Sequence, residues 1–180
     1  MTKTIREAHN WASSFLQQHS SHSADECHFT AEVLLRHLLS WNRARFFAYL
    51  DDPFPSELWT EWRRLVKQKS AGVPLQYLIG SQEFYGRHFR VDPHVLIPRP
   101  ETEGLVEEVL RRAASIWEQH ACTVVDVGTG SGAIAVTLAA ERPAWHVTAC
   151  DLSRDALRTA RDNAAQHKVE QRIRFLQGDL

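Results

Sequence analysis

The first seventy residues carry apolar side chains at the spacing of amphipathic helices. Apolar residues recur three and four positions apart, which places them on one face of a helix. The three stripes are Ile5, Ala8, Ala12, Phe15 and Leu16; Cys27, Ala31, Leu34, Leu35 and Leu38; and Leu58, Trp62, Leu65 and Val66. Ser23 and Glu26 precede the second stripe with the spacing of a capping box, which starts a helix. The pattern predicts a bundle of three or four helices, which either has no chemistry of its own or docks a macromolecule.

The pattern changes over residues 72–97, where β-branched and aromatic residues become frequent. Gly80 and Gly86 are turn points within this stretch, which predicts a β-hairpin or two short strands. Pro98 and Pro100 then end the strand and hold the chain extended. A further helix follows, with these apolar residues on one face: Leu105, Val106, Val109, Leu110, Ala113 and Trp117.

Strands and helices alternate in the last third of the chain. The strands are predicted over residues 123–127, 147–151 and 173–176, and the helices over residues 131–140 and 153–167. Such an order forms a parallel sheet with right-handed crossovers. The sequence therefore predicts an α/β fold in which ligands bind at the carboxyl ends of the strands.

The composition is that of a globular protein without a dominant charge. The 180 residues are 43% hydrophobic, and their net charge of −1 provides no basic field for nucleic acid. No segment approaches the roughly 18 apolar residues of a membrane span, and no apolar signal-peptide run is present. Three distant cysteines fit a reducing cytosol, and His19 and His22 lack a third metal ligand. We expect a cytoplasmic protein without a metal site, a membrane contact or a direct nucleic-acid partner.

A glycine-rich turn follows the predicted strand at residues 123–127. Gly128, Gly130 and Gly132 alternate in the order Gly-Thr-Gly-Ser-Gly-Ala, which satisfies the dinucleotide fingerprint. Asp151 lies 19 residues past Gly132, where such folds place a carboxylate on the ribose. A nicotinamide or flavin enzyme is therefore one interpretation. A Walker A phosphate loop is excluded, because no Gly-Lys-Ser or Gly-Lys-Thr follows.

Three features favour S-adenosylmethionine over a dinucleotide. More than a hundred residues precede the loop, whereas the dinucleotide fingerprint usually opens its domain. Asp126 lies two residues before the first glycine, and a carboxylate there attracts a cation rather than a pyrophosphate. S-adenosylmethionine carries an ammonium and a sulfonium, and it has no phosphate. Since Asp151 can accept hydrogen bonds from both ribose hydroxyls, Asp126 and Asp151 would bracket the two ends of one small cationic cofactor.

Four segments resemble the HemK/PrmC family of S-adenosylmethionine-dependent methyltransferases: GVPLQYLIGSQEFYGRHFRVDPHVLIPRPETEGLVE, VVDVGTGSGAIAV, ACDLSRDALRTARDNA and IRFLQGDL. The resemblance extends over essentially the whole chain, and its most specific part is LIPRPETE, Leu96 to Glu103. It implies methylation of the side-chain amide of the glutamine in the Gly-Gly-Gln loop of peptide-chain release factors. It also implies that the N-terminal helices dock the release factor.

The resemblance also assigns residues to the site. The glycine loop would wrap the methionine part of the cofactor, and Asp151 would take the ribose. Asp179 and Leu180 fall where the family contacts adenine, although the family commonly has an aromatic residue in place of Leu180. The implied cofactor-binding set is Asp126, Gly128, Thr129, Gly130, Ser131, Gly132, Asp151, Asp179 and Leu180. The residues expected to border the site of methyl transfer are Arg99, Pro100, Glu101 and Thr102.

The family holds the glutamine amide with an Asn-Pro-Pro-Tyr loop, and this sequence contains no such segment. We therefore expect no catalytic residue and no methyl transfer in the chain as it stands. A sheet of about three parallel strands would also leave an unpaired edge through which copies self-associate.

The predicted divisions of the chain are a helical docking domain over residues 1–71, a β-hairpin linker over residues 72–97, and part of a Rossmann-like methyltransferase domain over residues 98–180. Three alternatives stay open. The chain could be a non-catalytic module that binds a cofactor or a partner, or a glutamine methyltransferase that acts on a ribosomal protein. More remotely, it could be an NAD-dependent oxidoreductase.

Overall fold

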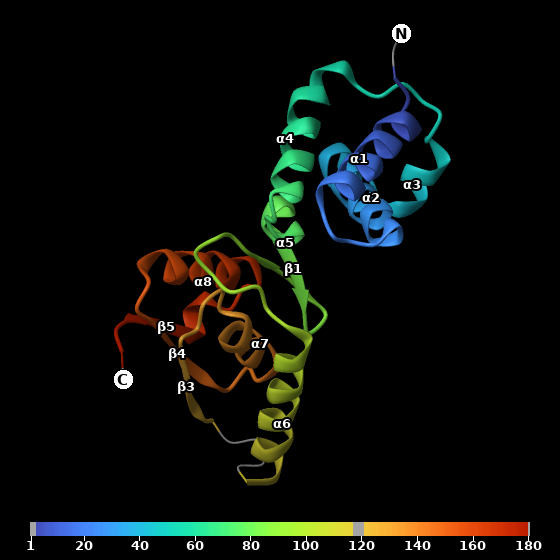
Figure 1. Ribbon diagram of the computed structural model, residues 1–180. Coiled ribbons are helices and arrows are strands. Elements are labelled where there is room, and N and C mark those ends of the chain that lie inside the picture. The colour runs from blue at the N-terminus through green and yellow to red at the C-terminus, as the bar shows by residue number, and fades with distance from the viewer. Residues whose placement is uncertain (1–2, 117–120, 180) are drawn as a thin grey trace. The chain divides into compact units, whose positions relative to one another are not determined.

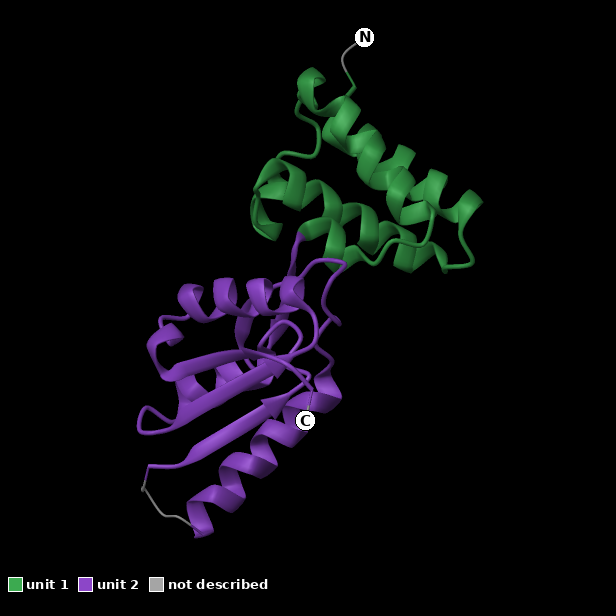
Figure 2. Ribbon diagram, turned by 90° about the vertical axis from the view of Figure 1, so that its left-hand side faces the viewer, with its two compact units in different colours: residues 1–79 green, residues 80–180 purple. Residues whose placement is uncertain are grey.

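The computed structural model describes residues 3–116 and 121–179. The chain divides into two compact units, unit 1 over Met1–Ile79 and unit 2 over Gly80–Leu180 (Figure 2). Each unit has its own hydrophobic core. Within the described residues, no helix combines the length and the apolar character that crossing a membrane requires.

Unit 1 is a helical bundle, which confirms the prediction from the apolar stripes (Figure 1). Its elements are α1 (Ile5–His19), α2 (Ala24–Leu39), α3 (Arg43–Ala48), the short 3-10 helix η1 (Ser56–Leu58), α4 (Trp59–Ser70) and α5 (Leu75–Ile79). The stripe residues face inward, and Phe15, Leu38 and Leu58 lie at the edge of the core. Trp62 is fully buried, and its indole N–H donates to the main-chain oxygen of Ala8 at 3.3 Å. This hydrogen bond lets the ring be buried with its polar atom satisfied.

The two longest helices of unit 1 begin at capping boxes. The Glu26 N–H donates to the Ser23 hydroxyl at 3.2 Å, and the Ser23 N–H donates to Glu26 Oε2 at 2.9 Å, which confirms the predicted box. Thr4 and Glu7 form the same arrangement at the start of α1. These reciprocal bonds satisfy donors that have no partner inside a helix.

Unit 2 opens with the predicted hairpin. β1 (Ser81–Phe84) pairs antiparallel with β2 (Arg87–Arg90). Tyr85 and Gly86 join the strands with φ values of +52° and +67°. Two successive positive φ values are characteristic of the turn whose twist matches that of a hairpin, so Gly86 is a turn point as expected.

The residues just before the hairpin form a helix, although the sequence pattern predicts extended structure for them. In α5, Leu75, Leu78 and Ile79 have the spacing i, i+3 and i+4, and all three pack against the core of unit 1. One helical turn is too short for this period to outweigh the β-branched and aromatic residues around it. The boundary between the two units along the chain therefore falls between Ile79 and Gly80. The functional division of the chain at residues 71 and 97 stays a prediction.

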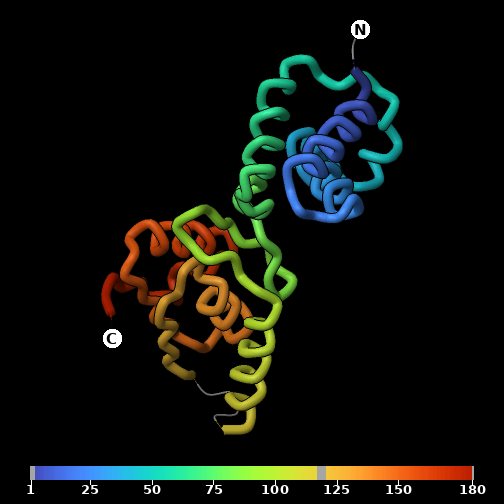
Figure 3. The backbone as a smooth tube through the Cα atoms, in the orientation of Figure 1, coloured from blue at the N-terminus to red at the C-terminus, as the bar shows by residue number. Residues whose placement is uncertain are grey.

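The centre of unit 2 is the predicted parallel sheet, in the order β3–β4–β5. Its elements are α6 (Pro100–Ile116), β3 (Thr123–Val127), α7 (Ala133–Glu141), β4 (His146–Asp151), α8 (Arg154–Gln166), the 3-10 helix η2 (Glu170–Arg172) and β5 (Ile173–Gln177). Figure 3 follows the chain through this alternation of strands and helices. The predicted strand at residues 123–127 is reproduced in full, and the other boundaries shift by one or two residues. The predicted α/β fold class is confirmed.

Helix α6 differs from its prediction in two ways. Pro100 is the first residue of the helix rather than the end of the extended segment. Proline suits this position, because the first N–H groups of a helix have no partner inside it. Leu105 is 53% exposed, whereas Val106, Leu110 and Ala113 are buried, and Trp117 lies outside the described residues. The buried stripe of α6 is therefore narrower than the sequence suggests.

Helices cover one face of the parallel sheet, and apolar residues of β3 on the opposite face are exposed. The strand order advances in one direction, so right-handed crossovers place α7 and α8 on the same face. Val147 and Ala149 of β4 belong to the core that these helices cover. On β3, Val125 and Val127 remain 53% and 50% exposed. An apolar sheet surface of this kind is a candidate contact face.

Candidate cofactor site

The candidate site lies where β3 ends and α7 begins, at the carboxyl end of a strand of the parallel sheet. Gly128, Gly130 and Gly132 have φ values of +72°, +55° and +79°. Residues with a side chain rarely adopt this backbone region, so the tight strand-to-helix turn requires glycine at all three positions. The predicted glycine loop is therefore a defined local structure.

The main-chain N–H groups of this loop donate to acceptors within the protein. The N–H groups of Gly128 and Thr129 both donate to the main-chain oxygen of Cys150, each at 2.9 Å. The Gly130 N–H donates to Asp151 Oδ2 at 2.9 Å, and the Gly132 N–H donates to the Thr129 oxygen at 2.8 Å. These four donors do not point at a ligand, unlike the N–H groups of a phosphate-binding loop.

Asp126 places a carboxylate at the N-terminus of α7. It accepts a hydrogen bond from the Thr129 hydroxyl at 2.6 Å and another from the Ala135 N–H of the first turn of α7. Burial raises the pKa of Asp126 above its ordinary value, and the nearby charge of Asp151 raises it further, while the two hydrogen bonds oppose the shift. A ligand cation would relieve this destabilisation of the ionised form.

The arrangement fits a cation and disfavours a pyrophosphate. In dinucleotide-binding folds the pyrophosphate sits at the helix N-terminus that follows the glycine loop. Here the carboxylate of Asp126 occupies that position and takes the Ala135 N–H. The carboxylates of Asp126 and Asp151 both accept hydrogen bonds from the glycine loop, and the charge of Asp151 raises the pKa of Asp126. The electrostatics therefore select a positively charged ligand over a negatively charged one.

Asp151 holds the loop as well as facing the site. Its Oδ2 accepts from Gly130, and its Oδ1 accepts from the Ser153 N–H at 2.9 Å, just before α8. Each carboxylate oxygen has a second lone pair, so both can still accept from hydroxyls. The sequence pattern predicts for Asp151 only a contact to the ribose, and that role stays a prediction. The hydrogen bonds from Gly130 of the glycine loop and from Ser153 add a structural role.

Gly132 has a packing role that its place in the fingerprint does not reveal. A Cβ atom built at this position would lie 3.1 Å from the Cβ of Ala160 and 3.2 Å from its Cα. The missing side chain therefore lets the start of α7 approach α8 closely. Thr129 and Ser131 are buried beside it. The structure thus brings the predicted residues Asp126, Gly128 to Gly132 and Asp151 together.

The segment expected to border the methyl-transfer site lies at the start of α6. Arg99, Pro100 and Glu101 are exposed and Thr102 is half-buried, with the Thr102 N–H donating to the Arg99 oxygen at 3.0 Å. These groups are accessible to a large partner, and their role stays a prediction. Asp179 is exposed at the end of the described chain, and Leu180 lies outside the described residues.

The sequence analysis missed Asn163, which is fully buried on α8. Its Nδ2 donates to the main-chain oxygens of Ser131 at 2.8 Å and Arg90 at 3.0 Å, and its Oδ1 accepts from the Arg90 N–H at 2.7 Å. One side chain therefore joins the glycine loop to the hairpin. The sequence does place a polar residue on the inner face of a predicted helix. Since buried polar side chains are almost always hydrogen-bonded, this position could have indicated a buried hydrogen-bonding role.

Two further acidic residues anchor the segment between the hairpin and α6. Asp92 accepts from the Thr159 hydroxyl at 2.7 Å and from the His94 N–H at 2.8 Å. Glu103 Oε1 accepts from the Tyr85 N–H at 2.9 Å. The first contact ties the segment to α8, and the second ties α6 to the hairpin turn. Residues 99–102 are thus held by contacts on both sides of the segment.

Two domain families match this chain. Residues 7–80 match the family described as PrmC N-terminal domain, and residues 124–180 match the family described as methyltransferase domain. The chain is similar to the release factor glutamine methyltransferase of Bacillus subtilis, with 45% identity over 179 residues, 99% of this chain and 60% of the relative. The corresponding protein of Neisseria gonorrhoeae is 43% identical over 82% of this chain and 52% of its own length. The chain thus spans about 60% of the length of the first of these curated relatives.

Solved structures of methyltransferases match shorter stretches. An RNA methyltransferase from Salinibacter ruber, in complex with S-adenosyl-L-homocysteine, is 25% identical with a TM-score of 0.38 and covers 46% of this chain and 50% of its own. A methyltransferase from Geobacter sulfurreducens in the same kind of complex is 27% identical with a TM-score of 0.34 and covers 41% of this chain and 29% of its own.

Proposed function

We propose that this chain, which belongs to the PrmC family, holds S-adenosylmethionine at the glycine loop and presents it to the glutamine of a peptide-chain release factor. The observation that carries the cofactor assignment is Asp126, a carboxylate at the N-terminus of α7. A pyrophosphate would be repelled there, whereas an ammonium or sulfonium would be attracted. An NAD-dependent oxidoreductase is therefore disfavoured.

The residues of the loop divide the task of holding the cofactor. Asp126 supplies negative charge for the cationic end, and Gly128 and Gly130 leave the backbone bare where the ligand must approach. Asp151 keeps free lone pairs for the ribose hydroxyls while it fixes the loop. The bound cofactor supplies an electrophilic methyl group on its sulfonium.

The proposed acceptor is the side-chain amide of a glutamine in a Gly-Gly-Gln loop. The relatives named as release factor glutamine methyltransferases support this assignment. An amide nitrogen is a weak nucleophile because its lone pair is delocalised, so the protein must act by positioning, an effect worth up to about 7–11 kcal/mol in ideal cases. In the family an Asn-Pro-Pro-Tyr loop positions the amide, and residues 1–180 contain no such segment.

The remaining parts of the chain would serve the macromolecular substrate. We assign the helices of unit 1 to docking of the release factor and residues 99–102 to the border of the methyl-transfer site. Translation termination places such an enzyme in the cytoplasm. The alternative substrate is a glutamine of a ribosomal protein. The family resemblance implies a Pro-Arg-Ser-type segment in the enzymes with that substrate, whereas this chain has Pro98-Arg99-Pro100, which disfavours the alternative.

A chimaera tests the proposed reaction. Residues 1–180 are joined to the part of the Bacillus subtilis relative that lies outside the match, and the product is incubated with a release factor and methyl-labelled S-adenosylmethionine. We expect label on the Gly-Gly-Gln glutamine with the chimaera and none with residues 1–180 alone. Label on a ribosomal protein instead of the release factor would overturn the substrate assignment. Turnover by residues 1–180 alone would show that the missing loop is not required.

A further inference from the structure

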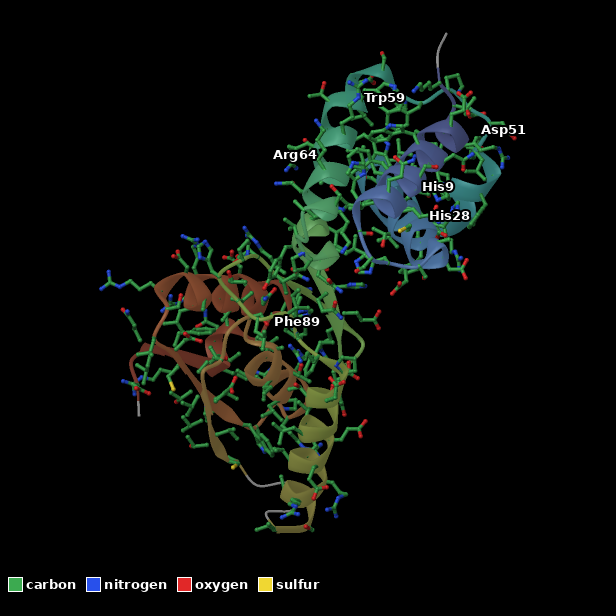
Figure 4. All side chains as sticks on the ribbon, in the orientation of Figure 1. His9, His28, Asp51, Trp59, Arg64 and Phe89 are labelled. Carbon is green, nitrogen blue, oxygen red and sulfur yellow. The ribbon has the colours of Figure 1, made fainter. Side chains whose placement is uncertain are left out.

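Unit 1 contains a hollow that the proposed chemistry does not use. It lies among α1, α2 and α3 and has a volume of about 430 Å³. Its lining includes Phe29, Phe46, Phe47 and Arg43, and we call it the Arg43 hollow. Figure 4 labels His9 and His28, which also line it and whose rings lie 5.4 Å apart. The volume is in the range of pockets that accept a ligand or a side-chain anchor.

The apolar part of the hollow has a buried floor and an open rim. Phe46 is 1% exposed and forms part of the floor. Phe29 of α2 and Phe47 of α3 are 57% and 53% exposed, although both are large aromatic side chains. Exposed aromatic rings around a concavity are the usual anchors of protein–protein contacts.

The polar part of the hollow carries an excess of positive charge. The buried carboxylate of Glu32 forms ion pairs with Arg36 at 3.1 Å and with Arg43 at 3.0 Å. Arg6, which also lines the hollow, pairs with Asp51 at 2.8 Å, so these three arginines face two carboxylates. The side chain of Arg43 is 66% exposed, and its guanidinium lies 5.5 Å from the centre of the Phe47 ring. The chain carries three arginines and no carboxylate between residues 33 and 50.

We propose that the Arg43 hollow docks the protein substrate through a segment that presents an apolar side chain next to carboxylates. The aromatic rim would cover the apolar side chain, and the guanidinium of Arg43 would pair with a carboxylate of the partner. One positive charge is left that Glu32 and Asp51 do not neutralise, so the hollow favours a partner segment that carries carboxylates. The inference rests on the proposed function for the identity of the substrate, and it adds the surface that recognises it.

Binding of a bacterial release factor to the 180-residue chain tests the surface. Two variants change the hollow, Arg43→Gln and Phe47→Ser. Two matched controls lie on the same unit outside its lining: Arg63→Gln, whose guanidinium lies 5.5 Å from the Trp59 ring, and Tyr49→Ser, whose side chain is 48% exposed. Calorimetry measures the Kd for the release factor and for S-adenosylmethionine, and circular dichroism checks the helix content.

We expect each hollow variant to raise the Kd for the release factor about tenfold or more, while each control changes it by less than about twofold. The affinity for S-adenosylmethionine should stay unchanged in all four, since these residues belong to unit 1. Added salt should weaken binding of the parent chain more than that of Arg43→Gln. Equal Kd values for parent and hollow variants would overturn the surface and leave the cofactor assignment intact.

Two other results also contradict the proposal. If the parent chain does not bind the release factor at all, both the surface and the substrate assignment are wrong. If an oligouridine binds the parent chain and loses affinity in Arg43→Gln while the release factor binds both equally, the hollow recognises single-stranded RNA. Arginine beside aromatic rings suits that ligand as well.

Discussion

Replacing Asn163 with leucine tests how the glycine loop is held in place. The side chain of Asn163 is fully buried and makes three hydrogen bonds, two to main-chain atoms of Arg90 and one to the Ser131 oxygen. Leucine has a similar volume and can make none of them. The substitution would therefore leave one N–H and two C=O groups without their partner.

The expected loss of stability follows from these orphaned groups. A buried polar group without a partner costs about 1–3 kcal/mol, and the contacts to Arg90 are only partly buried. We therefore expect Asn163→Leu to lower the free energy of unfolding of unit 2 by about 2–5 kcal/mol. Because the Ser131 oxygen belongs to the glycine loop, the affinity for S-adenosylmethionine should fall as well.

Hydrogen exchange during urea unfolding, read from peptides of residues 123–177, measures the stability of unit 2 separately from unit 1. The matched control is Asp162→Ala on the same helix, which removes an exposed ion pair to Arg90 with a distance of 2.9 Å. Exposed pairs contribute about 0–1 kcal/mol, so the control should differ little from the parent. If Asn163→Leu and Asp162→Ala lower the free energy of unfolding by the same small amount, Asn163 does not link the glycine loop to the hairpin as described.

Three further predictions concern the same unit. Gly132→Val should lower the stability of unit 2 by about 2–5 kcal/mol, because a Cβ at this position would lie 3.1 Å from the Cβ of Ala160 and because φ is +79°. The measurement is the melting temperature, and an unchanged value would contradict this close approach. Burial raises the pKa of Asp126, so the affinity for S-adenosylmethionine, measured by calorimetry across pH, should fall as the pH drops through that raised pKa and the carboxylate becomes neutral. Asp126→Asn should bind more weakly without this dependence, and an unchanged pH profile would refute the role of the charge. Val125→Lys on the exposed face of β3 should reduce concentration-dependent self-association through this apolar surface in sedimentation experiments, and a strictly monomeric parent would remove that expectation.

The element types follow from the sequence because their patterns are local. The helical stripes of unit 1, the capping box at Ser23 and the strand at residues 123–127 each depend on neighbours within a few positions, and all are confirmed. α5 is the exception, since one turn offers too few positions to show a helical period. Leu105 shows that a periodic stripe does not reveal how much of it the neighbouring elements cover.

The candidate site could be predicted only in part for a similar reason. The glycine pattern and the two carboxylates are visible in the sequence, and the structure brings them together at one turn. Asn163 bonds Arg90, 73 residues away in the chain, so no local pattern reveals that contact. The hydrogen bond from Gly130 of the loop to Asp151 was missed, because a carboxylate at the end of a strand suggests a ligand contact first.

The most direct test of the account is whether the glycine loop selects a cation over a pyrophosphate. The 180-residue chain is titrated by calorimetry with S-adenosylmethionine and, separately, with NAD, and both titrations are repeated with Asp126→Asn and Asp151→Ala. We expect a single saturable site for S-adenosylmethionine, with weaker binding in both variants, and no binding of NAD by the parent. Binding of NAD in preference to S-adenosylmethionine, or an S-adenosylmethionine affinity that neither variant alters, would contradict it.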